Sequence, residues 1–209
     1  MKLTSRSIED GAHIPGEFAF CAIDPKTHVA LSANRNPHLA WSDAPAATKS
    51  FAVICHDRDV PSRGDDVNQK GREVPASLPR VDFFHWLLWD IPADVHEIPA
   101  GSHCDGVTAR GKSGPAGPNG TRHGINDYTG WFAGDADMRG TYYGYDGPCP
   151  PWNDALVHRY VFTVYALDVT KLAIDGEPNG ANVRAALKNH VLAEARIGGT
   201  YTLNPRLSS

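Results

Sequence analysis

Short runs of β-forming residues dominate the hydrophobic pattern of the chain. The clearest run covers residues 158–167, where Val, Phe, Thr and Tyr follow one another and polar and apolar positions alternate. Residues 49–57 and 83–91 are continuous apolar runs of the length expected for buried strands, and the second is rich in aromatic side chains. Weaker strand patterns occupy residues 17–23 and 198–203. The pattern predicts a mainly β protein.

One segment has helical periodicity instead. In residues 182–196 the apolar positions, among them Val183, Leu187 and Val191, recur at the spacing of one helix face. Asn182 is the expected N-cap, and the glycines at 198–199 are expected to end the helix. Strands separated by turns, followed by a late helix, predict an antiparallel sheet or sandwich with a few peripheral helices, one of them near the C-terminus.

Two long segments match neither pattern. Residues 62–83 begin with a polar stretch interrupted by Gly and Pro, and residues 101–140 hold much of the glycine. Loops of this length in a compact domain usually have a function, such as covering a binding site. We therefore expect a single domain over residues 1–209 that carries two long loop insertions near 62–83 and 101–140.

Composition narrows the class of protein. The chain has 20 Lys and Arg against 24 Asp and Glu, a net charge of −4, and no basic tract, so we expect no nucleic-acid partner. The N-terminus lacks the apolar core of a secretory signal, and no stretch approaches the length of a transmembrane segment. The four cysteines lie far apart without a CxxC pair, which predicts reduced thiols in a cytoplasmic protein. No motif indicates a metal or another cofactor.

Candidate functional residues gather where predicted strands meet loops. Asp57 ends one strand, His85 lies within an aromatic run, and His158 and Tyr160 are two residues apart and so share a strand face. The preceding loop is stiffened by prolines and contains Cys149, Pro150 and Pro151. Two imidazoles, a phenol and a carboxylate beside a rigid loop would form a small anion-binding pocket.

Each of these residues also has an ordinary structural explanation. His85 and Tyr160 are the kinds of side chain that fill a core with their polar atoms satisfied. Asp57 is suited to capping a turn, and Cys149 is either a reactive thiol or a small residue in a rigid turn. The residue pattern alone leaves these alternatives open.

Longer motifs carry a resemblance to a known family. The stretch "GPCPPWNDALVHRYVFTVYALDV" resembles the G-x-C-P-P and H-R-Y signature of the phosphatidylethanolamine-binding protein (PEBP) family, in its bacterial Raf-kinase-inhibitor-like branch. "HDRDVP" resembles the D-P-D-A-P element of that family, with Arg58 and Val60 at the two positions that differ. "FHWLLWDIPADVHEIPAG" and "HVLAEARIGGTYTL" resemble two further family segments in the same order.

The resemblance implies a Greek-key β-sandwich with one small anion pocket. Matched residue by residue, that pocket consists of Asp57, His85, the Cys149-Pro150-Pro151 turn, His158 and Tyr160. The family also implies ligands that carry phosphate or another anionic group, a kinase or protease as the protein partner, and a homodimer. Because two imidazoles would face the anion, we expect the affinity to increase as pH falls from about 8 to about 6.

The alternative function is hydrolysis. In that case His158 or His85 would act as the base, Asp57 would orient it, and Cys149 or a water molecule would be the nucleophile. The sequence has no G-x-S-x-G elbow, Walker loop or metal-spaced His and Asp set. We therefore expect a binding protein rather than an enzyme.

Overall fold

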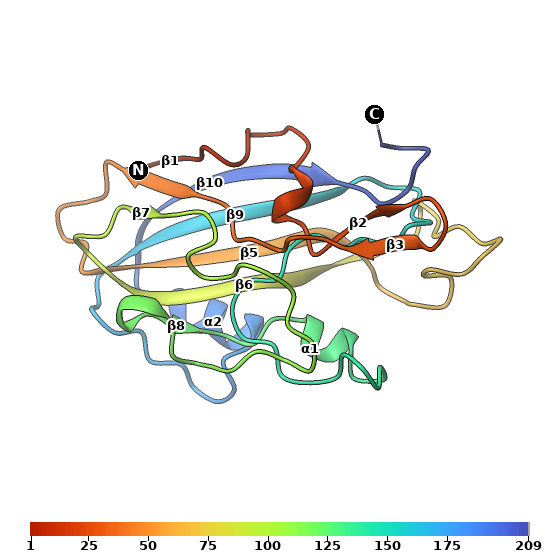
Figure 1. Ribbon diagram of the computed structural model, residues 1–209. Helices are drawn as coiled ribbons and strands as arrows, with labels where there is room; N and C mark the ends of the chain where they lie inside the picture. The colour runs from red at the N-terminus through yellow and green to blue at the C-terminus, as the bar shows by residue number, and fades with distance from the viewer. Residues whose placement is uncertain (209) are drawn as a thin grey trace.

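The computed structural model describes residues 1–208 and has a long antiparallel sheet at its centre (Figure 1). Neighbouring strands in this sheet are joined through antiparallel ladders. In spatial order they are β10 (Val191–Tyr201), β9 (His158–Leu167), β5 (Ser50–Pro61), β6 (Arg80–Pro92) and β8 (Arg122–His123). The predicted mainly β, antiparallel fold is therefore confirmed, and the strand predicted at 158–167 has those bounds.

Shorter strands cover one face of the long sheet and enclose the main core with it. They form a three-stranded sheet and a two-stranded sheet, both antiparallel. The first consists of β1 (Lys2–Thr4), β4 (Leu39–Ser42) and β7 (Glu97–Ile98), and the second of β2 (Cys21–Asp24) and β3 (His28–Leu31). Trp41 on β4 packs edge-on against Phe51 on β5, with ring centroids 5.3 Å apart, and both are buried. This contact joins the two layers.

Helix α2 (Gly180–Leu187) covers part of the opposite face of the long sheet, below it in Figure 1. Val183 and Leu187 are buried there with Phe84 and Leu87 of β6. Gly180 is needed at the contact, because a Cβ atom at this position would lie 2.1 Å from the Phe84 ring. The other helical segments are η1 (Gly16–Phe18), η2 (Pro118–Gly120) and α1 (Tyr128–Trp131). The expected peripheral helix near the C-terminus is thus present.

The predicted helix over 182–196 was too long. Helix α2 ends at Leu187, and its N-cap is Asn179, whose side chain accepts a hydrogen bond from the Asn182 amide at 3.0 Å. Residues 191–196 belong to β10, where burial alternates along the strand as it pairs with β9. Over six residues, an alternation of apolar and polar positions with small residues among them fits the helical period as well as the strand period. Pairing with β9 then selects the strand.

The glycines at 198–199 also had a different role from the one predicted. Both lie within β10 rather than after a helix. A Cβ atom at Gly199 would approach Ile14 to 2.5 Å, so the small residue permits the N-terminal segment to pack against the strand. The predicted strand over 17–23 was partly wrong as well, because η1 occupies its first part and β2 begins only at Cys21.

The prediction that all four cysteines stay reduced was wrong. Cys21 and Cys149 form a disulfide that joins β2 to the loop before β9. Cys55 and Cys104 are free and buried, and burial raises the pKa of Cys104 to about 11, which leaves its thiol unreactive. Structural disulfides are typical of oxidising compartments. The cytoplasmic location stays a prediction, and the disulfide weighs against it.

Within residues 1–208, none of the helices combines the length and the apolar character that crossing a bilayer requires.

The disulfide gives a first test. Without reductant, alkylation of the unfolded chain should label two thiols, Cys55 and Cys104, and after reduction it should label four, counted by mass spectrometry. The double variant Cys21→Ser with Cys149→Ser should lose about 2–5 kcal/mol of unfolding free energy in denaturant titrations, because the unfolded chain is no longer constrained. Labelling of four thiols before reduction would contradict the assignment.

Candidate functional site

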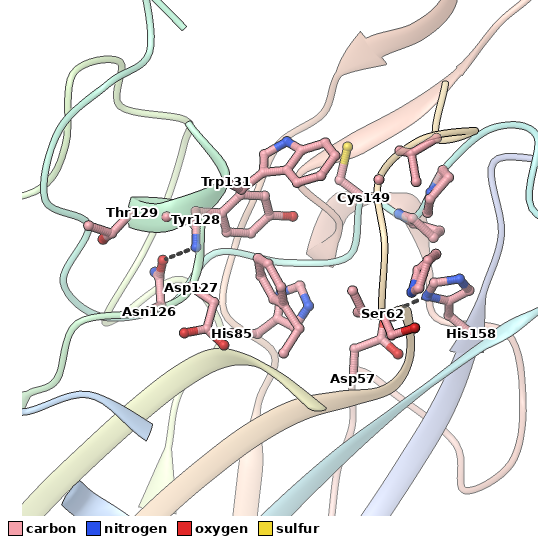
Figure 2. Close-up of a pocket in the computed structure, with 18 of the residues that line it drawn as sticks. Asp57, Ser62, His85, Asn126, Asp127, Tyr128, Thr129, Trp131, Cys149 and His158 are labelled. Carbon is pink, nitrogen blue, oxygen red and sulfur yellow. Dashed lines mark hydrogen bonds and ion pairs between the residues drawn. The ribbon is translucent and has the colours of Figure 1, made fainter. Parts of the chain in front are cut away.

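All seven residues selected from the sequence line one cavity of about 650 Å³. It opens at the end of the long sheet where β5 ends, β6 begins and β9 starts (Figure 2). These residues are Asp57, His85, Cys149, Pro150, Pro151, His158 and Tyr160. The structure therefore brings together side chains from three strands and the proline-rich loop.

Strand pairing explains how three of these residues meet. Asp57 on β5 is directly opposite Tyr160 on β9, and His158 lies two residues before Tyr160 on the same face. All three are buried on the face that also carries Phe162 and the main core. The site is therefore the polar end of the main core.

His85 reaches this face through a β-bulge. Cys55 pairs with Trp86 and His56 pairs with Phe84, so His85 is an extra residue of β6 without a partner on β5. A bulge of this kind interrupts the alternation of faces and redirects a side chain. As a result His85 lines the cavity although the next residue, Trp86, is buried in the main core.

The most strongly bonded group of the site is the His158 imidazole. Its Nδ1 lies 2.6 Å from Oδ2 of Asp57, and its Nε2 lies 3.1 Å from Oδ2 of Asp154. Arg80 at the start of β6 makes a bidentate ion pair with the same Asp154 carboxylate, at 2.6 and 3.0 Å. Two cations and two carboxylates thus form one nearly solvent-excluded network.

The network fixes the charge of His158. Burial alone would lower its pKa, but the hydrogen bonds and charges of Asp154 and Asp57 raise the pKa to about 9. Burial likewise tends to raise the pKa of Asp154, and hydrogen bonds from His158 and Arg80 hold that pKa below its usual value. At neutral pH His158 is therefore an imidazolium.

This geometry corrects the role predicted for His158. Both ring nitrogens are already bonded to carboxylates, so no N–H remains to donate to a bound anion. The Asp57 carboxylate is also occupied, because its Oδ1 accepts the Asp59 amide at 2.8 Å and its Oδ2 faces His158. Of the roles considered for Asp57, ordering an imidazole is the one that the structure contains.

His85 is the imidazole that remains available to a ligand. Its Nδ1 lies 2.7 Å from the backbone carbonyl of Asp146, and Nε2 makes no hydrogen bond to any described residue. Tyr128 and Tyr160 pack edge-on against the ring, with centroids 5.5 and 5.2 Å away. Burial lowers the pKa of His85, although the nearby Asp57 carboxylate opposes the shift. His85 is therefore neutral at pH 7.

The hydroxyl of Tyr160 is a second uncommitted group. It is buried at the cavity lining and has no hydrogen-bond partner among the described residues. Burial, followed by the charge of the nearby Asp57 carboxylate, raises the tyrosine pKa well above its usual value, so the hydroxyl keeps its proton. The hydroxyl lies close to that carboxylate but outside hydrogen-bond geometry. A buried donor without a partner is costly, and a ligand oxygen would satisfy it.

The wall of the cavity that contains Pro150 and Pro151 is fixed by bonds to β2 and to the residue before it. The disulfide ties Cys149 to β2, and the amides of Phe20 and Cys21 both donate to the carbonyl of Pro148, at 2.9 and 3.1 Å. A Cβ atom at residue 147 would lie 2.1 Å from the Phe18 carbonyl, so only glycine permits this close approach. Because its sulfur is in a disulfide, Cys149 cannot be the thiol nucleophile of the hydrolase alternative.

Sequence reasoning missed much of the outer lining of the cavity. The long loop after β5 contributes several residues, and the second long segment contributes an aromatic group around α1 (Figure 2). The missed residues include Arg63, Asn68, Phe83, Asp127, Tyr128, Trp131 and Glu177. The two long segments were expected to cover a binding site, but their individual residues were not selected. In the stretch "GINDYTGWF" the aromatic residues were a signal, and Trp131 is 52% exposed at the mouth.

The predicted loop insertion at 62–83 is shorter than expected, since β6 already starts at Arg80. Its residues line the cavity, and they are anchored to the loop before β9: the Asn153 side chain donates to the carbonyls of Asp66 and Arg72. This segment therefore forms part of the rim. Among residues 1–208, no three His, Cys, Asp or Glu side chains are grouped to hold a metal ion.

The His158 network predicts how stability depends on pH. Because the folded-state pKa is about 9 and the unfolded value is 6.5, the folded chain binds the extra proton between these values. The stabilisation is complete below pH 6.5 and should be lost as pH rises through 9, on the order of 3 kcal/mol. Denaturant titrations at pH 6, 7.5 and 9 measure it.

A matched pair of variants separates the network from other titrations. His158→Gln should cost about 3–5 kcal/mol and flatten the pH dependence, because two buried carboxylates then share only one cation, Arg80. His190→Gln removes an imidazole from a half-exposed pair with Asp168 and should cost less than about 1 kcal/mol. Equal stability of the unmodified protein at pH 6 and pH 9 would refute the assignment.

Comparisons with known proteins agree with this architecture. The family model described as "Phosphatidylethanolamine-binding protein" matches residues 4–202. YbhB of Escherichia coli K12 is 32% identical to this chain, over 97% of this chain and the whole length of YbhB. YbcL of the same organism is 29% identical, over 97% of this chain and 87% of YbcL.

Solved structures share the fold. The crystal structure of E. coli YbcL, described as a new member of the mammalian PEBP family, covers 96% of this chain and 97% of its own, with a TM-score of 0.67 at 27% identity. A PEBP homologue from Chlamydia trachomatis, CT736, shares the fold with a TM-score of 0.60 at 24% identity, covering 96% of this chain and 95% of its own. On the strength of the family match, the full-length relatives and the shared fold, this chain belongs to the phosphatidylethanolamine-binding protein family.

Proposed function

We propose that the cavity binds a small anionic group, such as the phosphate of a small molecule, through His85 and Tyr160. The proposal rests on the presence, in the lining of the same cavity, of two polar groups that make no hydrogen bond to any described residue. These are the Nε2 atom of His85 and the unpartnered hydroxyl of Tyr160. The rigid wall at 149–151 would lose little entropy when a ligand binds.

The charges in the cavity determine when an anion can enter. The charge of Asp57 is balanced by His158, Arg63 at the rim is paired with Asp65 at 3.9 Å, and the carboxyl residues Asp127 and Glu177 also line the cavity. With His85 neutral, the cavity offers no free positive charge in its interior. An anion without a proton of its own is therefore bound only when His85 takes up a proton.

This refines the pH dependence expected from the sequence. His158 stays charged up to about pH 9 and contributes no change between pH 8 and 6. Between pH 8 and 6 the increase in affinity should come mainly from His85, whose pKa is lowered by burial. Asp127 also has a pKa raised by burial, so at mildly acidic pH it loses repulsive charge and acts in the same direction.

Binding rather than catalysis is the function that we propose. The hydrolase alternative named His158 or His85 as the base and Cys149 or a water molecule as the nucleophile. In this structure Cys149 is bridged to Cys21 and His158 is fully bonded, so of these groups His85 and a water molecule remain. His85 lacks an adjacent nucleophile from the chain. A kinase or protease partner and a homodimer stay predictions from the family resemblance.

Sulfate is a suitable probe, because it keeps its charge and carries no proton between pH 5 and 8. If only the protonated His85 form binds, the association constant should fall on the order of tenfold between pH 7 and pH 8. Isothermal titration calorimetry should also detect uptake of about one proton at pH 7.5. The result depends on His85 being largely neutral over this range.

Three variants test the assignment of this effect. His85→Gln should weaken sulfate binding and remove the pH dependence above pH 6. His103→Gln should keep it, although His103 also has a pKa lowered by burial, to about 4, because His103 does not line the cavity. Asp127→Asn should keep the slope between pH 6 and 8. If neither sulfate nor phosphate binds at pH 5.5, or if His85→Gln binds as the unmodified protein does, the proposed function is wrong.

A further inference from the structure

The Asp146 carboxylate is the centre of a buried polar network behind the cavity. It is fully buried and accepts hydrogen bonds from the side-chain amides of Asn34 and Asn126, each at 2.8 Å. The Lys112 ammonium lies 2.8 Å from the same carboxylate. Three donors from separate segments thus hold one carboxylate, and none of these four residues belongs to the set selected from the sequence.

The same residue also fixes the orientation of His85. The backbone carbonyl of Asp146 lies 2.7 Å from His85 Nδ1, and the Asp146 amide donates to the His85 carbonyl at 3.0 Å. Asn34 further accepts the amide of Gly147, the next residue, at 2.8 Å. The backbone around Asp146 is therefore held on both sides, and its carbonyl cannot turn away from the imidazole.

The chemistry of that contact selects one tautomer. A backbone carbonyl only accepts hydrogen bonds, so Nδ1 of neutral His85 must carry the proton. Nε2 then has a lone pair and no proton. The groups that face the ring are the Asp57 carboxylate, the Asp146 backbone, the His158 imidazolium, and the rings of Phe83, Tyr128 and Tyr160. None of them donates a hydrogen bond to Nε2.

We propose that Asp146 and its donors are positioning groups that present the His85 Nε2 lone pair to the cavity, so that the site selects an oxyanion that carries its own proton. Hydrogen phosphate has a P–O–H group that donates to Nε2, and a phosphomonoester has one in its monoanionic form. Sulfate has none, although near pH 8 it has about the same size and charge as hydrogen phosphate. This selectivity rests on the anion-binding function proposed above, whereas the tautomer does not.

The first measurement needs no ligand. ¹⁵N-detected NMR of histidine-labelled protein at pH 7.5 should show His85 with a protonated Nδ1 and an unprotonated Nε2. Comparison with His85→Gln assigns the signals. A spectrum with the proton on Nε2, or an equal mixture of tautomers, overturns the positioning role whether or not any anion binds.

The second measurement tests the selectivity. At pH 8 inorganic phosphate should bind at least about tenfold more tightly than sulfate, since one charge-assisted hydrogen bond corresponds to that ratio or more. At pH 5.5 the ratio should shrink, because a larger fraction of His85 is then protonated and donates to either anion. Equal affinities at pH 8 overturn the selectivity while leaving the proposed anion binding in place, and absence of binding by both anions at either pH overturns the proposed function instead.

Variants connect the two measurements to Asp146. Asp146→Asn should introduce Nε2-protonated His85 and reduce the ratio of phosphate to sulfate affinity. Lys112→Met is the milder change, because it keeps the alkyl chain and removes only one donor, and it should shift both readouts in the same direction. Asp90→Asn is the matched control: Asp90 is also buried and accepts the Leu172 amide at 2.9 Å, but it does not line the cavity.

Asp90→Asn should therefore lower stability without changing the His85 tautomer. If Lys112→Met leaves both readouts at their unmodified values, the network does not position His85. The same conclusion follows if Asp90→Asn changes the tautomer as much as Asp146→Asn does.

Discussion

The positive charge of His158, enclosed between two carboxylates, is the interaction on which the rest of the site depends. Asp57 comes from β5, Asp154 from the loop before β9, and Arg80 adds the start of β6 to the same group. The two positive charges of His158 and Arg80 therefore balance the two carboxylates at the end of the sheet where these three strands meet. Without the imidazolium, the protein would hold two buried carboxylates with one cation, which is a strongly unfavourable arrangement.

Because this network uses all the polar atoms of His158, a ligand must find its partners elsewhere. The free groups belong to β6 and β9, and the one on β6, His85, is bonded to a different network, centred on Asp146 in the loop that follows α1. Stability and recognition thus use separate residues. Burial lowers the pKa of both histidines, but only His158 is bonded to two carboxylates, so its pKa is raised whereas that of His85 stays lowered.

The sequence predicted the residues of the site better than their roles. Alternation in β9 placed His158 and Tyr160 on one face, and the family motifs brought Asp57, His85 and the 149–151 turn to the same cavity. No local pattern reports that a buried histidine meets two carboxylates, since Asp57 lies 101 positions away in the chain. The Cys21–Cys149 disulfide was equally invisible, because two of four widely spaced cysteines can pair in several ways. The helix predicted over 182–196 was too long for a simpler reason. Residues 191–196 fit the helical period and the strand period alike, and only the pairing with β9 decides between helix and strand.

The bulge in β6 has a consequence for how this strand can vary in length. Upstream of His85, Phe84 faces helix α2, and downstream Trp86 faces the main core, so the extra residue sets the phase of the faces along the strand. Removing a single residue there would exchange inside and outside for every position on one side of the deletion, which would turn Phe84 or Trp86 toward the wrong layer. A point substitution in β6 changes one side chain, whereas deletion of one residue would change the face on which every side chain beyond the deletion lies. Length, as much as residue identity, is therefore constrained at this position.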